Sequence, residues 1–328
     1  MEQVYVPSLI ESEVNGIVST LQKQNDDFSL NFSKMYKVRC FEMMIFLMNV
    51  LQLKKSNTIT IDDDFNKYGA SYARTMKLYD AINDFDLVSA SKINSNFTTI
   101  TKIDYSFLYD YYSQVTDWHQ GLEAYSADLA NIIIKENHNL EKVIEYCIRE
   151  IIRNTLEHNI GYGREYCNVF IVAQVHKSDK KAELVFADNG VGIRRTLSNI
   201  NKFGDNIKTD SDALKLAVQP GISSESCKNE GDWSNSGFGL YVTSEIMKKI
   251  GSFTLYSMDG GIKIDSGGIH TVDNAYIPGT IIKLEVNYDI FLEESSKDFI
   301  DKLVKQGESF ASKNSNAIKT ASKKSRTI

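Results

Sequence analysis

The segment 140–158 (LEKVIEYCIREIIRNTLEH) constrains the fold more than any other part of the chain. On a helix, which turns by about 100° per residue, its apolar residues form one broad side that must be buried. These residues are Val143, Ile144, Cys147, Ile148, Ile151, Ile152 and Thr155. Glu150, Asn154 and His158 recur every fourth residue and form a stripe along the edge of that side. Such an edge suits the wall of a cleft, but an ordinary amphipathic helix with polar boundary residues would show the same pattern.

Length and charge limit the class of protein. With 328 residues, of which 42% are hydrophobic, the chain is long enough for about two domains with hydrophobic cores. Its net charge of −6 gives no overall attraction to nucleic acid, so a nucleic-acid partner is not expected. The longest apolar run, 41–53, is too short for a membrane span and is interrupted by Glu42, Asn49 and Gln52. We therefore expect a buried helix there and no membrane contact.

The N-terminus and the cysteines favour a cytoplasmic protein. Residues 1–13 (MEQVYVPSLIESE) carry acidic residues and lack the order of basic and apolar regions that marks a signal peptide. Cys40, Cys147, Cys167 and Cys227 are scattered and form neither a zinc pattern nor a disulfide framework. Thiols in a reducing compartment fit this distribution best.

Residues 1–118 alternate between short β-like runs and helix-like segments. The runs are QVYV, FSLNF, TITI and FTTITKI, and the helix-like segments lie near 9–23, 39–53 and 69–84. This alternation predicts a small α/β domain, with no phosphate loop after any of its strands. The stretch 29–53 faintly resembles the strand and helix of a STAS-type module, which would make the domain a regulatory or docking unit; a generic α/β domain is the alternative.

Residues 119–290 have a different pattern, in which helices come first. Two long helical segments, near 121–136 and 139–159, precede the strand-like stretches NVFIVAQVH and AELVFAD. We expect a long polar, irregular stretch, a further helix and further strands to follow. This order predicts an α+β domain with helices on one face of a mixed, largely antiparallel sheet.

Residues 291–328 are expected to be a helix followed by a basic tail. The helix is predicted within FLEESSKDFIDKLVKQ. The last sixteen residues, KNSNAIKTASKKSRTI, include five basic residues and no acidic ones. Such an end is typical of a disordered, solvated tail, and a weak contact with an anionic partner is the alternative.

Two glycine motifs lie in the middle of the second domain. LVFADNGVGI is a strand that ends at Asp188 and enters Gly190 and Gly192, and Gly237 and Gly239 open the helix of NSGFGLYVTSEIMKKIG. Glycines at the start of a helix leave free N–H groups for a phosphate. A carboxylate at a strand end can accept a hydrogen bond from an exocyclic amine such as that of adenine. Neither motif is a Rossmann fingerprint or a Walker loop.

In order, the chain has ExxxN on a helix, DxGxG, GxGL opening a helix, and PGT before a strand. This series is similar to that of the GHKL ATPase superfamily, which includes gyrase-type topoisomerases, heat-shock chaperones, mismatch-repair ATPases and the ATP-binding domains of histidine kinases. The resemblance covers about 120–287, roughly half of the chain. It implies a GHKL-type ATP-binding α/β sandwich with ATP and Mg²⁺ as ligands.

The resemblance assigns the polar stripe to the phosphate side of such a site. Glu150 matches the glutamate that activates water as general base in hydrolysing members. Asn154 matches the asparagine whose oxygen holds Mg²⁺. His158 matches a position against the nucleotide in kinase-like members.

The glycine motifs match the remaining nucleotide contacts. Asp188 matches the adenine-binding aspartate, and Thr280 matches a threonine that supports adenine recognition. Gly190 and Gly192 match the turn that makes room for the base, and Gly237 and Gly239 match the loop around the phosphates. The neighbouring residues Ile193, Phe238 and Leu240 complete the expected contacts.

Between the two glycine motifs, the long polar stretch resembles the ATP lid of the family. The sequence QPGISSE looks like the turn that precedes the second glycine motif. We expect the lid to be mobile without nucleotide, and its residues 222–236 to gain protease resistance when an ATP analogue binds. Residues 261–279 are expected to lengthen the last hairpin, and the sequence suggests no function for them.

The sequence leaves the reaction open. Our first hypothesis is a bacterial, cytoplasmic hydrolase that binds ATP and Mg²⁺ and uses lid closure and slow hydrolysis to control a protein partner. A protein kinase of the anti-sigma or atypical histidine-kinase type is the second, and a non-catalytic adenine-nucleotide sensor is the third. His119 and His138 lack the His-Glu helical context of a phosphoacceptor. Homodimerisation occurs in the family, and we expect it here only on the basis of that resemblance.

Overall fold

The computed structural model describes residues 2–62, 68–84, 96–111, 117–135, 137–160, 168–199, 203, 207–223, 236–273, 275–314 and 316–322, without the side chains of 158–160. Its secondary structure confirms the predicted α+β class, with a three-stranded parallel sheet and a seven-stranded antiparallel sheet. Among the described residues, no helix is long and apolar enough to cross a membrane.

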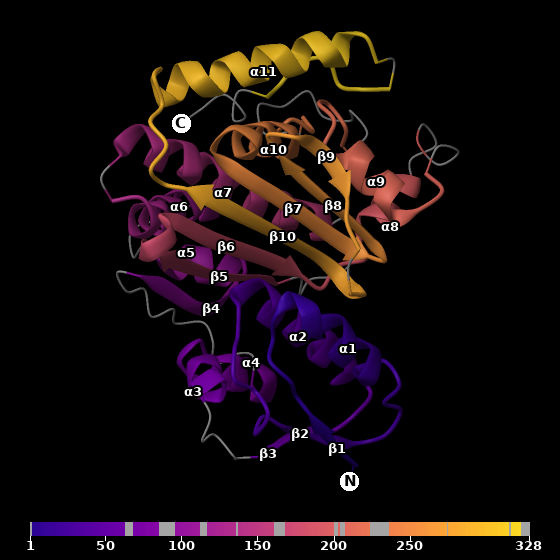
Figure 1. Ribbon diagram of the computed structural model, residues 1–328. Coiled ribbons are helices and arrows are strands. Elements are labelled where there is room, and N and C mark those ends of the chain that lie inside the picture. The colour runs from indigo at the N-terminus through magenta and orange to yellow at the C-terminus, as the bar shows by residue number, and fades with distance from the viewer. Residues whose placement is uncertain are drawn as a thin grey trace.

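The N-terminal unit, residues 2–84, holds the small sheet and its helices. Its elements are β1 (Glu2–Tyr5), α1 (Glu11–Leu21), β2 (Phe28–Asn31), α2 (Cys40–Leu53), β3 (Ile59–Asp62), α3 (Tyr68–Thr75) and α4 (Leu78–Asn83). Helix α2 is the expected apolar run, and it is buried from Cys40 to Val50 because it packs against β6 and β10 of the large sheet. Figure 1 shows α1 and α2 between the two sheets.

The large sheet has the strand order β4-β5-β6-β10-β7-β8-β9. Its strands are β4 (Phe97–Ile103), β5 (Val169–His176), β6 (Lys181–Asp188), β7 (Gly251–Met258), β8 (Gly260–Asp265), β9 (Gly268–Thr271) and β10 (Ile277–Asn287). A 3₁₀ turn, η2 (Lys177–Asp179), joins β5 to β6. Strand β4, which we expected in the first domain, pairs with β5 at the edge of this sheet. The domain division at residue 118 remains a prediction.

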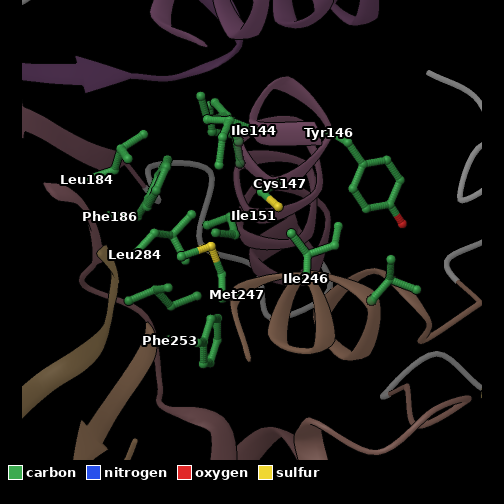
Figure 2. Close-up of a cluster of buried hydrophobic side chains, with 14 of the residues drawn as sticks. Ile144, Tyr146, Cys147, Ile151, Leu184, Phe186, Ile246, Met247, Phe253 and Leu284 are labelled. Carbon is green, nitrogen blue, oxygen red and sulfur yellow. The ribbon is translucent and has the colours of Figure 1, made fainter. Parts of the chain in front are cut away.

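Helices cover the face of the large sheet opposite the N-terminal unit. They are α5 (Tyr105–Tyr111), α6 (Trp118–Ile133), α7 (His138–Ile160) and α10 (Gly239–Ile250). Along β6, Leu184 and Phe186 join the core under α7, whereas Val185 and Ala187 join the core under the N-terminal unit. Figure 2 shows the first core, in which Cys147 and Ile151 of α7 lie among side chains of the sheet, such as Leu184, and of α10, such as Met247. Burial of both faces explains why β5 and β6 contain long apolar runs.

The stretch after Gly192 is more regular than expected. It contains α8 (Ile193–Ser198) and α9 (Asp210–Ala217), so the prediction of an irregular polar stretch is wrong for these residues. Thr209 and Asp212 form a capping box at the start of α9, and α9 packs against β8. Residues 224–235 lie outside the described residues, and so does the prediction that this part of the lid is mobile.

The C-terminal helix α11 (Ser296–Ser312) packs against α10 and α7, and Figure 1 shows it on the side of the molecule away from the N-terminal unit. After α11 the chain turns back. Ala317 is buried, and the N–H of Ile318 donates to the carbonyl oxygen of Gly221 at 2.8 Å. The prediction of a disordered tail is therefore wrong for 316–322, while 323–328 lie outside the described residues.

Candidate functional site

One pocket opens between α7, the end of β6, α8 and the start of α10. Its space is about 980 Å³, including the part that opens to solvent. Its lining residues are Ile151, Asn154, Thr155, Phe186, Ala187, Asp188, Gly190, Val191, Gly192, Ile193, Thr196, Leu197, Ala217, Ile222, Gly237, Leu240, Thr280 and Ile282.

Eight residues that the sequence singled out line this pocket together. They are Asn154, Asp188, Gly190, Gly192, Ile193, Gly237, Leu240 and Thr280. Three others, Glu150, Phe238 and Gly239, are not among the lining residues, and the side chain of His158 lies outside the described part of the chain. The structure thus brings most of the candidate residues together, and their roles as nucleotide ligands remain predictions.

The turn after β6 forms one end of the pocket. Asp188 is the last residue of β6, and its Oδ1 accepts a hydrogen bond from the N–H of Gly190 at 2.7 Å, which holds the turn in shape. Gly192 has a φ of +81°, and a Cβ there would lie 2.9 Å from side-chain atoms of Met258. Both facts require glycine at position 192.

Thr280 lies directly beside Asp188 because β10 and β6 pair in that register. Its side chain is 9% exposed and lines the pocket. Before it, Gly279 has a φ of +134°, and a Cβ there would lie 2.0 Å from the carbonyl oxygen of Asp188. The PGT sequence therefore permits a close approach of the two strands at the pocket.

Helix α10 begins at the other end of the pocket, and its N-cap residue, Phe238, makes no side-chain cap. Gly237, with a φ of +69°, turns the chain into this helix, and its carbonyl oxygen accepts a hydrogen bond from the N–H of Gly221 at 3.1 Å. The first N–H groups of a helix and the positive end of its dipole attract anions. The start of α10 can therefore bind a phosphate group.

Glu150 lies behind this helix start and not in the pocket. Its carboxylate is fully buried, and its Oε2 is 2.6 Å from Nη2 of Arg153. A Cβ at position 239 would lie 2.3 Å from the same oxygen, so only glycine fits there. Burial lowers the pKa of Arg153, but Glu150 and Glu157 outweigh it and raise that pKa above its usual value, so the guanidinium stays charged.

Sequence reasoning missed the apolar lining of the pocket. Phe186 precedes Asp188 by two residues on β6, and Ile282 follows Thr280 by two residues on β10. Alternate residues of a strand share a face, so this periodicity was the signal that could have placed both beside the polar pair. Ile222 and Ala217 come from the stretch between the glycine motifs, whose path the sequence does not reveal.

A scan against models of protein families found no match for the chain, and neither did a search of curated proteins.

Proposed function

We propose that the protein is a GHKL-type ATPase that binds ATP and Mg²⁺ in this pocket and uses slow hydrolysis and lid movement to control a protein partner. One observation carries the proposal. Four motifs that are far apart in the sequence contribute Asn154, Asp188, Gly237 and Thr280 to a single pocket. Their order and their convergence are the arrangement that the resemblance implies.

The Asp188 end of the pocket suits the adenine base. A carboxylate accepts hydrogen bonds and cannot donate them when ionised, so it pairs with an amino group. Phe186 and Ile282 add apolar surface beside Asp188 and Thr280. An aromatic base with an exocyclic amine matches both features.

The other end suits the phosphates. The N-terminus of α10 offers N–H groups, and Asn154 lines the pocket one turn of α7 beyond Glu150. Among the described residues no group of three or more His, Cys, Asp or Glu side chains could hold a metal ion. A single amide oxygen fits Mg²⁺, which takes its other ligands from phosphates and water and would neutralise phosphate charge there.

The position of Glu150 favours slow chemistry. To act as a general base, its carboxylate must come within hydrogen-bond reach of the attacking water. The ion pair with Arg153 holds it behind Gly239 instead. The same observation favours a second candidate function, a non-catalytic adenine-nucleotide sensor, in which Glu150 only supports the start of α10.

The site assignment is tested with Asp188→Asn. Replacing one carboxylate oxygen by an NH₂ group turns an acceptor into a donor facing the amine, so ATP affinity should fall by about a hundredfold or more. Calorimetric titration with ATP and Mg²⁺ measures this. Asp179→Asn, at the far end of the β5–β6 hairpin, is the control and should bind as the wild type does. Unchanged binding by Asp188→Asn would mean that the site is assigned wrongly.

The reaction is tested by following the label from γ-labelled ATP. Release of free phosphate that is lost in Glu150→Ala, while that variant still folds and binds ATP, supports the ATPase. Label on the protein or on an added partner supports a kinase, and its stability to acid or alkali separates Ser/Thr from His as the acceptor. Binding without either product, unchanged in Glu150→Ala, supports the sensor.

A further inference from the structure

Ser257 is a buried hydroxyl that ties together two of the pocket motifs. It is the second-last residue of β7, is 1% exposed and does not line the pocket. Its Oγ is 2.7 Å from the carbonyl oxygen of Gly279, 3.1 Å from the backbone nitrogen of Ile193 and 3.4 Å from Oγ1 of Thr280. It therefore links the turn after β6 to the start of β10.

The direction of each of these hydrogen bonds follows from the groups involved. A hydroxyl has one proton to donate and two lone pairs to accept with. The Gly279 carbonyl can only accept, so it takes the proton of Ser257. The Ile193 N–H can only donate, so it uses one lone pair of Ser257. Between Ser257 and Thr280 only one direction is left, in which Thr280 donates its proton to Ser257.

This direction sets the chemistry that Thr280 presents to the pocket. Because its proton points toward Ser257, its remaining lone pairs are the groups that it can offer to a ligand. Asp188, its neighbour across the strands, is also an acceptor when ionised. Asp188 and Thr280 are thus both acceptors, and they match a group of the ligand that donates hydrogen bonds.

On the basis of the nucleotide site proposed above, we propose that Ser257 is a positioning residue that determines base specificity. By fixing the hydroxyl of Thr280 as an acceptor, it favours a purine with a 6-amino group and disfavours one with a 6-carbonyl group. In this proposal Asp188 and Thr280 both face the exocyclic group at position 6, so the carbonyl oxygen of the second purine would meet two acceptors. Without Ser257, the proton of Thr280 is released and can point into the pocket.

The test compares ATP with inosine triphosphate, which has an oxygen in place of the 6-amino group. Affinities for both, with Mg²⁺, are measured by calorimetry for the wild type, Ser257→Ala and the control Ser252→Ala. Ser252 lies at the other end of β7 and is also buried, at 6% exposed. We expect Ser257→Ala to lower the ratio of ATP to inosine triphosphate affinity by about tenfold, the effect of reversing one hydrogen bond. We expect Ser252→Ala to keep the wild-type ratio.

The sign of the change separates specificity from simple loosening. The inference requires that inosine triphosphate binds more tightly to Ser257→Ala than to the wild type, whereas a loosened pocket would bind both nucleotides less well. An unchanged ratio, or an equal loss for both, overturns the role of Ser257 and leaves the ATP site standing. If the wild type binds neither nucleotide, the proposed function itself fails. Should Ser257→Ala not fold, Ser257→Cys, which keeps the shape with a much poorer hydrogen-bonding group, decides by the same criterion.

Discussion

Glu150 and Arg153 form a buried ion pair one helical turn from the pocket, and each charge depends on the other for compensation. Among the described residues, Oε1 of Glu150 and Nε of Arg153 have no hydrogen-bond partner, although the Nε of Arg149 is 3.9 Å from that Oε1. Two charges in such a place are tolerated because each offsets the desolvation of the other. Removing one of them leaves the other buried and only partly compensated.

Arg153→Met should therefore destabilise the protein strongly. The expected loss in free energy of unfolding is about 3–5 kcal/mol, because the Glu150 carboxylate loses its closest partner. Denaturant unfolding measures the loss, and adding Glu150→Gln to Arg153→Met should recover much of it. The control is Lys248→Met, which removes a partly exposed pair with Glu245 at 3.7 Å and should change stability by about 1 kcal/mol at most. Equal effects for the two single variants would contradict a tightly coupled buried pair.

At the scale of elements, the C-terminal segment supports the start of α10 from outside the pocket. Gly307 of α11 lies so close to α10 that a Cβ there would be 2.6 Å from the ring of Tyr241. Farther on, Ile318 pairs with Gly221, whose N–H in turn donates to Gly237. The two glycines that flank residues 222–236 are thus joined to each other and to the tail.

Gly221→Ala tests this connection. Gly221 has a φ of +75°, and a Cβ there would lie 2.2 Å from the carbonyl oxygen of Ile318. We expect a loss of about 1–3 kcal/mol in free energy of unfolding and faster tryptic cleavage after Lys319, because the tail must move away. Gly16→Ala is the matched control: it lies in α1 with no atom within 4 Å of its added Cβ, and should gain about 0.5–1 kcal/mol. Resistance of Lys319 to trypsin in Gly221→Ala would show that the tail is not held through this contact.

Some of these features can be predicted from the sequence, and others cannot. The long amphipathic helix and the apolar strands follow from local periodicity, and α7, β5 and β6 have it over many residues. Helix α9 is short, yet its Thr209 and Asp212 capping box is a local signal that could have identified it. The role of Ser257 and the contact of Ile318 depend on partners far away in the chain, so no local pattern reveals them. The pocket was predictable only because its residues occur in four ordered motifs.

At the scale of the whole molecule, the large sheet separates the pocket from the N-terminal unit. On the face of the sheet that the N-terminal unit covers, polar side chains form hydrogen bonds with that unit. Glu183 of β6 accepts a hydrogen bond from the N–H of Phe41 in the first turn of α2 at 3.0 Å. Gln174 of β5 accepts from the hydroxyl of Tyr72 at 2.7 Å. The attachment of the unit thus includes a carboxyl group that can titrate, in addition to apolar packing.

The two acidic side chains at this junction make stability depend on pH. Burial raises the pKa of Glu183, although Lys283 opposes it. Burial and the charge of Glu183 raise the pKa of Glu42, which is 5% exposed and is opposed by Lys283 and Arg39. A carboxyl group with a raised pKa in the folded state holds its proton more tightly there than in the unfolded chain. Such a group contributes to the stability of the folded state. This contribution is fully present below the ordinary glutamate pKa of 4.5 and is lost as the pH rises through the raised pKa of the folded state.

Glu183→Gln should remove the contribution of Glu183 to this dependence while keeping the hydrogen bond, because the amide oxygen can still accept from Phe41. We expect the variant and the wild type to have similar free energies of unfolding near pH 4.5, and the variant to become progressively more stable than the wild type as the pH rises toward 8. Urea unfolding at a series of pH values measures the difference. Glu285→Gln is the contrasting control. Burial raises the pKa of Glu285, but the ion pair with Lys181 at 2.9 Å and nearby lysines outweigh burial and lower this pKa below its usual value. The wild type should therefore be more stable than Glu285→Gln at neutral pH and should lose that advantage as the pH falls. Parallel pH profiles for Glu183→Gln and the wild type would mean that the pKa of Glu183 is the same in the folded and unfolded states, so that Glu183 contributes nothing to the pH response of the N-terminal unit.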